Sequence, residues 1–470
     1  MPDLSTKPDK KWKRFLRNWE FKIAVFVILY FLFSHYVLEN THVVGERGLR
    51  NHLKVIPEEV VDYYGKQPVE GAEKLAYAQY ATNYDYLNLA IINFAHLRKG
   101  GTKIPNLVIL YDEVLQYHSA QMWNNLYQVA NHYKITLRPV HLIKVNYDDD
   151  TPWAASFTKF HIFNQVDFDR IVYFDSDSML VHPTLDNGEI SSSYSNIDEL
   201  FNVPKELEFA LPQAYWLNNV VEGKSALKYR KKVEIPDARR YGLRMRKLVH
   251  DISETGDWKL LPSLIFEAHK FDNPDNFFAN HIMVVTPSKS TFEDLMKYVH
   301  NPVRWSLTNR KNLRKKTDYD MEILNKYLNN ELKSGRVNIG ILPHRVYGVL
   351  TGEFREPWHE RFVVQPQYLP FIKKRSNRGW DAMKTLQKVK LIHFSDSPIP
   401  KPWEMEEGDE EYEHPYSTKL IFCKTGNMSE YRAKYSHFKP RLVDDCDSVE
   451  VWNWLRNQFK KEREGIWFSE

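Results

Sequence analysis

The chain has 470 residues, long enough to bury one large core or two smaller ones. Aromatic residues make up 14% of it, and there is no low-complexity tract or block repeat, so we expect a folded protein rather than a disordered chain. The net charge of +4 is small and does not indicate a nucleic-acid-binding protein, which would need a strongly basic face.

The first predicted element is a membrane anchor. Residues 21–38 are nearly all apolar, and eighteen helical residues span about 27 Å, enough for a thin secretory-pathway bilayer. The positive-inside bias places the residues before them in the cytoplasm, because six of these are basic: Lys7, Lys10, Lys11, Lys13, Arg14 and Arg17. No small-residue cleavage site follows, so we expect a single transmembrane signal anchor after a cytoplasmic tail of residues 1–20.

The rest of the chain would then be lumenal. Residues 39–74 are polar and contain several Gly and Pro residues, which predicts a stem between the membrane and a globular domain. The two cysteines, Cys423 and Cys446, could pair in an oxidising lumen or remain as free buried thiols. Asn427 begins an Asn-x-Ser glycosylation sequon, a pattern that also arises by chance.

Strands and helices alternate from Lys74 onward. The predicted strands are 76–81, 107–111, 135–140 and 171–174, and the predicted helices are 86–99, 119–133 and 153–165. Such alternation indicates parallel strands joined by crossover helices. No Gly-x-Gly-x-x-Gly follows the first strand and no Walker sequence occurs, so neither a dinucleotide dehydrogenase nor a P-loop ATPase is expected.

Two acids follow the strand at 171–174. Asp175 and Asp177 stand where an apolar run ends and before the chain turns apolar again. The end of a strand is where an open α/β sheet presents its chemistry. Two carboxylates this close repel each other unless a cation neutralises them, and hard oxygen ligands suit Mg²⁺ or Mn²⁺ beside substrate phosphates. Other Asp-x-Asp pairs occur in the chain, but only this one ends an apolar strand.

The second half of the chain is more irregular. Further strands are predicted at 209–212, 281–286, 337–342 and 389–394, with helices starting near Ser288 and over 320–328. Residues 213–270 form a basic insert that is either a solvated surface or a loop facing an acceptor. We place the globular catalytic domain at 75–403 and a C-terminal extension at 404–470.

A second motif lies at the end of the strand at 389–394. An apolar run delivers His393, and a proline-rich loop then delivers Lys401. An imidazole is a good ligand for Mn²⁺ and would complete a site rich in carboxylates. A lysine ammonium can neutralise diphosphate charge. His393 could instead be a satisfied core histidine, but its place at the end of a strand, before Lys-Pro-Trp, favours a ligand.

These motifs resemble those of family 8 glycosyltransferases. Members of that family carry a strand-end Asp-x-Asp and a late His followed by Lys-Pro-Trp, here Asp175, Asp177, His393 and 401–403. The resemblance implies a GT-A fold, which is a Rossmann-like mixed sheet with flanking helices, and a requirement for Mn²⁺. The similarity extends from about Ala76 to Trp403.

The same resemblance implies further site residues. Thr82, Asn83 and Tyr86 match the loop that holds the nucleoside. Lys159, in a Thr-Lys-Phe-His stretch, is expected to reach the donor sugar or its phosphate, and Asp320 to contact the donor sugar or orient the acceptor. One departure is the stretch 279–281, which reads Ala-Asn-His where the family often has Asn-Ser-Gly.

With its anchor, the chain is most similar to fungal Golgi N-acetylglucosaminyltransferases. This implies a single-pass type II protein of the Golgi membrane that transfers GlcNAc from UDP-GlcNAc to mannose side chains of glycoprotein glycans, with retention of configuration. Two alternatives stay open: a transferase for another nucleotide sugar (glucose, galactose or mannose), and a non-catalytic nucleotide-sugar- or glycan-binding protein. A two-metal phosphoesterase would need a second ligand cluster, and we find none in the sequence.

Overall fold

The structure is a computed structural model. It describes residues 52–145, 151, 153–186, 189–214, 238–263, 278–300, 318–351, 381–394, 401–404, 421–423, 441–443 and 446–467, together with residues 19, 23 and 25–30. The predicted anchor is described only at residues 23 and 25–30, all of them helical. No described helix is both long enough and apolar enough to cross a bilayer.

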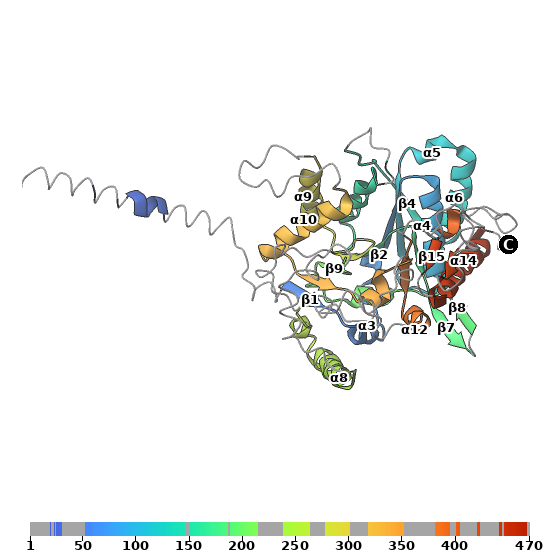
Figure 1. Ribbon diagram of the computed structural model, residues 1–470. Helices are drawn as coiled ribbons and strands as arrows, with labels where there is room; N and C mark the ends of the chain where they lie inside the picture. Colours follow the sequence, from blue (N-terminus) through green and yellow to red (C-terminus); the bar gives the residue numbers. More distant parts are fainter. Residues whose placement is uncertain are drawn as a thin grey trace, which may run out of the picture.

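A mixed eight-stranded sheet forms the centre of the domain (Figure 1). Its order is β1 (Leu53–Val55), β11 (Ile339–Ile341), β9 (Phe209–Leu211), β10 (Ile282–Val285), β5 (Arg170–Phe174), β2 (Leu75–Ala81), β3 (Asn106–Asp112) and β4 (Thr136–Val140). Seven strands run in one direction, and β10 runs antiparallel to both of its neighbours, β5 and β9.

Both faces of this sheet are covered, which explains why its central strands read as continuous apolar runs. In β5 every residue is buried. Val172 and Phe174 pack in one core with α4 (Tyr84–Lys99), α6 (Ala120–His132) and α14 (Cys446–Trp467). Ile171 and Tyr173 face the other core, with η2 (Ser156–Asn164), α9 (Lys289–His300) and α10 (Asp320–Lys333). The expected mixed sheet with flanking helices is therefore confirmed.

A second, three-stranded sheet stands beside the first. Its order is β12 (Val349–Leu350), β13 (Leu391–His393) and β6 (Ser178–Leu180). β6 follows β5 after only three residues and pairs antiparallel with β13. Two chain segments far apart in sequence, 175–180 and 391–394, are thereby joined at the edge where β5 ends.

The remaining elements are short or peripheral. They are α3 (Glu58–Tyr64), α5 (Leu115–His118), α8 (Ala238–Thr255), α12 (Ala382–Leu386), η1 (Ala72–Lys74), η3 (Asp198–Asn202), η6 (Trp258–Leu260), η9 (His344–Gly348), η12 (Pro402–Glu404) and the pairs β7 (Pro183–Asp186)–β8 (Glu189–Ser192) and β14 (Ile421–Cys423)–β15 (Arg441–Val443).

Most predicted strands and helices are confirmed, with ends shifted by a few residues, but two predictions need correction. The stem prediction for residues 39–74 is wrong from Leu53 onward, because β1 is an edge strand of the main sheet and α3 packs against η3 and α8. Lys54 and Pro57 interrupt the apolar residues of the segment 53–57, so the sequence did not indicate this short strand. The helix expected at 153–165 is the 3₁₀ helix η2.

The C-terminal extension returns to the domain at α14. Leu455 and Phe459 of α14 lie in the same core as α4, and Glu462 lies 3.0 Å from Nδ1 of the buried His96. The side chains of Cys423 and Cys446, and all of Asn427, lie outside the described residues. The disulfide and the glycosylation stay predictions.

Candidate metal and diphosphate site

The acid pair lies at the end of β5, in the short link to β6. The backbone N–H of Asp175 donates to the carbonyl of His281 (2.8 Å), and the N–H of Phe394 donates to the carbonyl of Asp177 (2.9 Å). Between the acids, the Ser176 hydroxyl donates to the carbonyl of Tyr80 (2.7 Å). Neighbours from both sheets therefore hold the link, which fixes where the two carboxylates lie.

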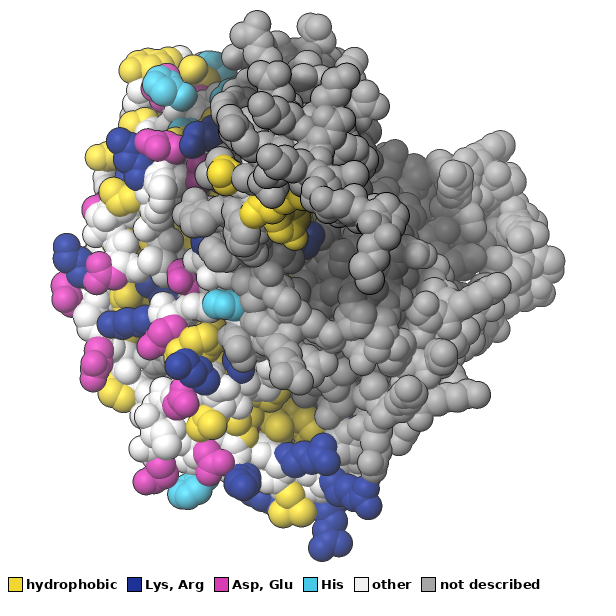
Figure 2. Space-filling view, turned by 90° about the vertical axis from the view of Figure 1, so that its left-hand side faces the viewer, with side chains coloured by type: hydrophobic (Ala, Val, Ile, Leu, Met, Phe, Trp, Pro, Cys, Tyr) yellow, Lys and Arg dark blue, Asp and Glu magenta, His cyan; other side chains and the backbone are white. Residues whose placement is uncertain are grey.

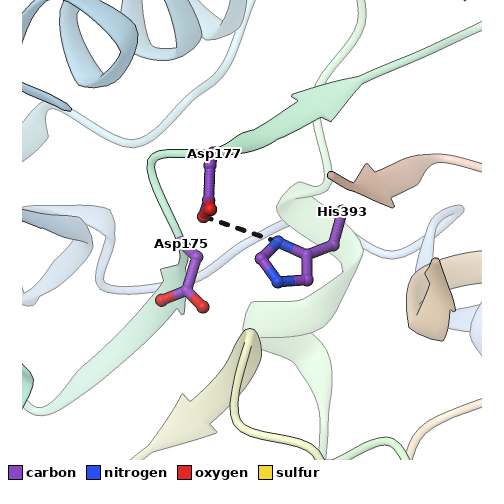
Figure 3. Close-up of side chains that lie close together, drawn as sticks. All are labelled: Asp175, Asp177 and His393. Carbon is purple, nitrogen blue, oxygen red and sulfur yellow. Dashed lines mark ion pairs between the residues drawn. The ribbon is translucent and has the colours of Figure 1, made fainter. Parts of the chain in front are cut away.

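His393 reaches the acids because β13 pairs with β6. The register places His393 opposite Ser178, one residue after Asp177. One ligand atom from each of Asp175, Asp177 and His393 lies within 4.8 Å of the others, and Figure 3 shows the three side chains converging. The Nδ1 atom of His393 is 3.5 Å from Oδ1 of Asp177. Two residues predicted from one strand end and a third from 216 positions further along are thus brought together.

This cluster fits a divalent cation. It combines carboxylate oxygens with one imidazole nitrogen, a donor set that suits Mn²⁺. The three side chains are only 11–16% exposed, so the two negative charges are poorly screened by water. In the described part of the chain this is the one group of three or more such residues close enough to share an ion.

Each acid of the pair has its own lysine partner. The Nζ of Lys401 donates to Oδ2 of Asp177 at 2.7 Å. The Nζ of Lys159 lies 3.0 Å from Oδ1 of Asp175 and 2.8 Å from Oδ2 of Asp320. All five charged residues predicted from the sequence thus belong to one connected cluster around His393.

The electrostatics of the two acids differ. Burial raises the pKa of Asp175 above its ordinary value, although Lys159 and His393 oppose this. Burial acts in the same direction on Asp177, but the charges of His393 and Lys401 outweigh it, so the pKa of Asp177 is lowered. Asp320 also has a lowered pKa, because Lys159 outweighs the effect of burial. The charges around the pair therefore stabilise the ionised form of Asp177 more than that of Asp175.

The residues predicted to hold the nucleoside lie at the same edge of the sheet. Thr82 and Asn83 follow β2, which is the neighbour of β5, and Tyr86 is in the first turn of α4. The side chain of Asn83 caps α4 by accepting from the backbone N–H of Tyr86 (2.9 Å). That carboxamide oxygen is therefore engaged in the helix start, and the contact of these residues with a nucleoside stays a prediction.

The structure adds site residues that sequence reasoning missed. Tyr173 donates its hydroxyl to Asp175, and the Asn280 amide donates to Oδ2 of Asp320 at 2.7 Å. The ring of His281 stacks on that of His393, with centroids 5.0 Å apart and parallel planes. The stretch 279–281 departs from the resembled family, but no sequence pattern indicates these contacts.

Of the basic insert predicted at 213–270, the structure describes residues 213–214 and 238–263. Helix α8 exposes five basic side chains: Arg239, Arg240, Arg244, Arg246 and Lys247. Figure 2 shows Lys and Arg side chains gathered at the lower edge of the molecule. The buried side of α8 includes Met245 and Ile252, and Tyr241 donates to Glu59 of α3 (3.2 Å). An acceptor-facing role stays a prediction.

Comparisons with known proteins place the chain in a family. No family model matches it. The protein named glucose N-acetyltransferase 1 of Candida albicans is 65% identical over 466 residues, covering 99% of this chain and all of that protein. The protein of the same name from Debaryomyces hansenii is 44% identical and covers 96% of this chain and 97% of its own length.

Solved structures are more distant. The galactosyltransferase LgtC in complex with donor and acceptor sugar analogues is 10% identical, with a TM-score of 0.37, over 71% of this chain and 93% of that one. A score this low adds nothing to the assignment, which depends on the two relatives matched over nearly their full length. The chain therefore belongs to the glucose N-acetyltransferase 1 family and is a glycosyltransferase.

Proposed function

We propose that this protein transfers GlcNAc from UDP-GlcNAc to mannose side chains of glycoprotein glycans, by a metal-dependent reaction on a GT-A fold. The observation that carries the proposal is the convergence of Asp175, Asp177 and His393 from two sheets. The names of its full-length relatives contain glucose and N-acetyl, which agrees with an N-acetylated glucose as the transferred sugar.

The cation would be held by the two carboxylates and the imidazole, and Mn²⁺ is the ion we propose. When bound, it would supply positive charge that stabilises the negative charge on the departing nucleotide. The protein contributes the placement of the ligands: backbone hydrogen bonds from both sheets hold the segments that carry them.

Lys401 would bind the diphosphate. Its side chain is 21% exposed, more than the other charged groups of the cluster, and its ammonium already lies on Asp177. From that position it can turn to a phosphate oxygen and neutralise charge that grows as the nucleotide leaves. The Nζ of Lys401 also lies 5.5 Å from the centroid of the Trp403 ring, a cation–π contact that helps to hold the ammonium beside the site.

Asp320 and Lys159 form the sugar side of the proposed site. Asp320 accepts from Asn280 and pairs with Lys159, so its carboxylate is oriented by two donors. We assign it to contact the donor sugar or to orient the acceptor. We expect retention of anomeric configuration by attack on the face from which the nucleotide leaves.

The cellular setting is also part of the proposal. Residues 21–38 would anchor the protein in the Golgi membrane as a single-pass type II protein, with Lys7 to Arg17 in the cytoplasm. Expressing the full chain with a tag at each end and treating sealed vesicles with protease tests this topology. Protection of the N-terminal tag would contradict it.

A donor screen tests the reaction. The protein is incubated with each UDP- or GDP-sugar in turn, Mn²⁺ and a mannan acceptor, and the product is identified by mass and by linkage analysis. Transfer of GlcNAc supports the proposal, and transfer of glucose, galactose or mannose instead contradicts the choice of donor. Binding of UDP-sugar without hydrolysis or transfer would favour the non-catalytic alternative.

A further inference from the structure

His281 contacts both halves of the candidate metal site. It immediately precedes β10, the one antiparallel strand of the described main sheet, and it is only 4% exposed. Its backbone carbonyl accepts the N–H of Asp175 at 2.8 Å. Its ring stacks on His393 with parallel planes and a centroid distance of 5.0 Å.

The ring of His281 is itself anchored. Its Nε2 lies 3.3 Å from the carbonyl oxygen of Tyr347, at the end of the segment that leads into β12 of the small sheet. One residue therefore joins the end of β5, the start of β10 and the small sheet. Each of these carries or supports a ligand of the proposed cation.

The contacts of His393 explain why such a residue is needed. The Nδ1 of His393 faces Asp177 at 3.5 Å and the hydroxyl of Ser178 at 3.3 Å, but these contacts lie at one edge of the ring. An edge contact leaves the tilt of the imidazole plane open, whereas a parallel ring on one face restricts it. A ligand nitrogen must point at the ion, so ring tilt affects affinity.

From these contacts we infer that His281 is a positioning residue. Its flat ring fixes the tilt of the His393 imidazole, and its backbone carbonyl fixes the position of the Asp175 backbone. The inference rests on the proposed metal-dependent function and assigns His281 no contact with substrate. The histidine at the last position of the stretch 279–281, where the resembled family often has Gly, would then support this metal site.

Two apolar variants of His281 isolate the role of the ring. His281→Phe keeps a flat ring, and His281→Leu does not, while both lose the contact with Tyr347 and keep the backbone carbonyl. His96→Leu is the matched control, because His96 is also a buried histidine but lies in α4 beside Ser195 and Glu462. The readouts are the Kd for Mn²⁺ from electron paramagnetic resonance or calorimetry, and the thermal unfolding midpoint.

We expect His281→Leu to raise the Kd for Mn²⁺ about tenfold or more, and His281→Phe to raise it much less. His96→Leu should lower the unfolding midpoint and leave the Kd unchanged. Equal Kd values for wild type and His281→Leu, or equal losses in the Leu and Phe variants, would overturn the inference.

The same titration separates this inference from the proposed function. If the wild type binds Mn²⁺ with the expected ranking of variants but transfers no sugar, the positioning role stands and the proposed reaction fails. If the wild type binds no Mn²⁺, both are rejected.

Discussion

Lys159 and Lys401 each pair with one acid of the strand-end motif, but in different surroundings. The Lys159 side chain is only 4% exposed and pairs with both Asp175 and Asp320. Its ammonium also lies over the rings of Tyr80 and Tyr173. Lys401 is 21% exposed and comes from the short η12 region, at the edge of the described site. The Lys159 side of the site is an internal network of charges. On the other side, Lys401 is exposed enough to contact a ligand that enters the site.

This difference suggests that the two lysines have different roles. A buried network with several donors is preorganised and changes little when a ligand arrives. A lysine at the more exposed edge of the site can exchange its carboxylate partner for a phosphate oxygen, because one negatively charged acceptor then replaces the other. We therefore expect mutations on the Lys159 side to affect folding first, and mutations on the Lys401 side to affect ligand binding first.

The largest effect should follow removal of a proposed cation ligand. Asp175→Asn, Asp177→Asn and His393→Ala should each lower turnover about a thousandfold, since each removes part of the electrostatic stabilisation of the leaving group. Turnover is measured at saturating donor and Mn²⁺, with circular dichroism to show that each variant is folded. Wild-type turnover in any folded variant would remove that residue from the site.

The next effect separates the two lysines by stability. Lys159→Met leaves Asp175 and Asp320 buried without their cation, and should lower the free energy of unfolding by about 3–5 kcal/mol. Lys401→Met should cost clearly less, because its pair is more exposed. Urea denaturation at neutral pH measures both variants. Similar losses would show that the two sides do not differ as described.

Added Mn²⁺ should distinguish the proposed cation ligands from Lys401. At a hundred times its Kd, Mn²⁺ should raise the free energy of unfolding of the wild type by about 2.7 kcal/mol. Asp177→Asn should show no such gain. Lys401→Met should bind Mn²⁺ at least as tightly as the wild type, because the ammonium that competes for Asp177 is gone. Weaker Mn²⁺ binding in that variant would argue against competition.

The smallest effect concerns acid pH. Asp320 has a pKa below its ordinary 3.8, so its ionised form stabilises the fold above about pH 5, and this contribution is lost as pH falls through the folded-state pKa. The stability difference between wild type and Asp320→Asn should therefore shrink below about pH 4.

Asp175 acts with the opposite sign in the metal-free protein. Its pKa is raised, so its contribution is present at low pH and is lost as pH rises through the folded-state value. Unfolding curves from pH 7 to 3 for wild type, Asp320→Asn and Asp175→Asn would resolve the two trends. A constant gap between wild type and Asp320→Asn at every pH would contradict the assignment for Asp320.

The sequence by itself determined the local features of this protein. The apolar run before Asp175 predicts a buried strand that ends in two acids, since continuous apolar residues indicate a strand covered on both faces. The alternation from β2 to β5 likewise predicts parallel strands and covering helices. His393 and Lys401 could be named because a short strand and a proline-rich loop carry them, a local pattern supported by family resemblance.

Only the tertiary structure decided which distant groups meet. The antiparallel direction of β10 places His281 against both Asp175 and His393, and this depends on pairing with β5 and β9 rather than on its own residues. The edge strand β1 is too short to show a periodicity, and it forms because β11 offers it a partner. Strand pairing and ring contacts are set by the free energy of the whole packed core, so three or four residues read alone do not specify them.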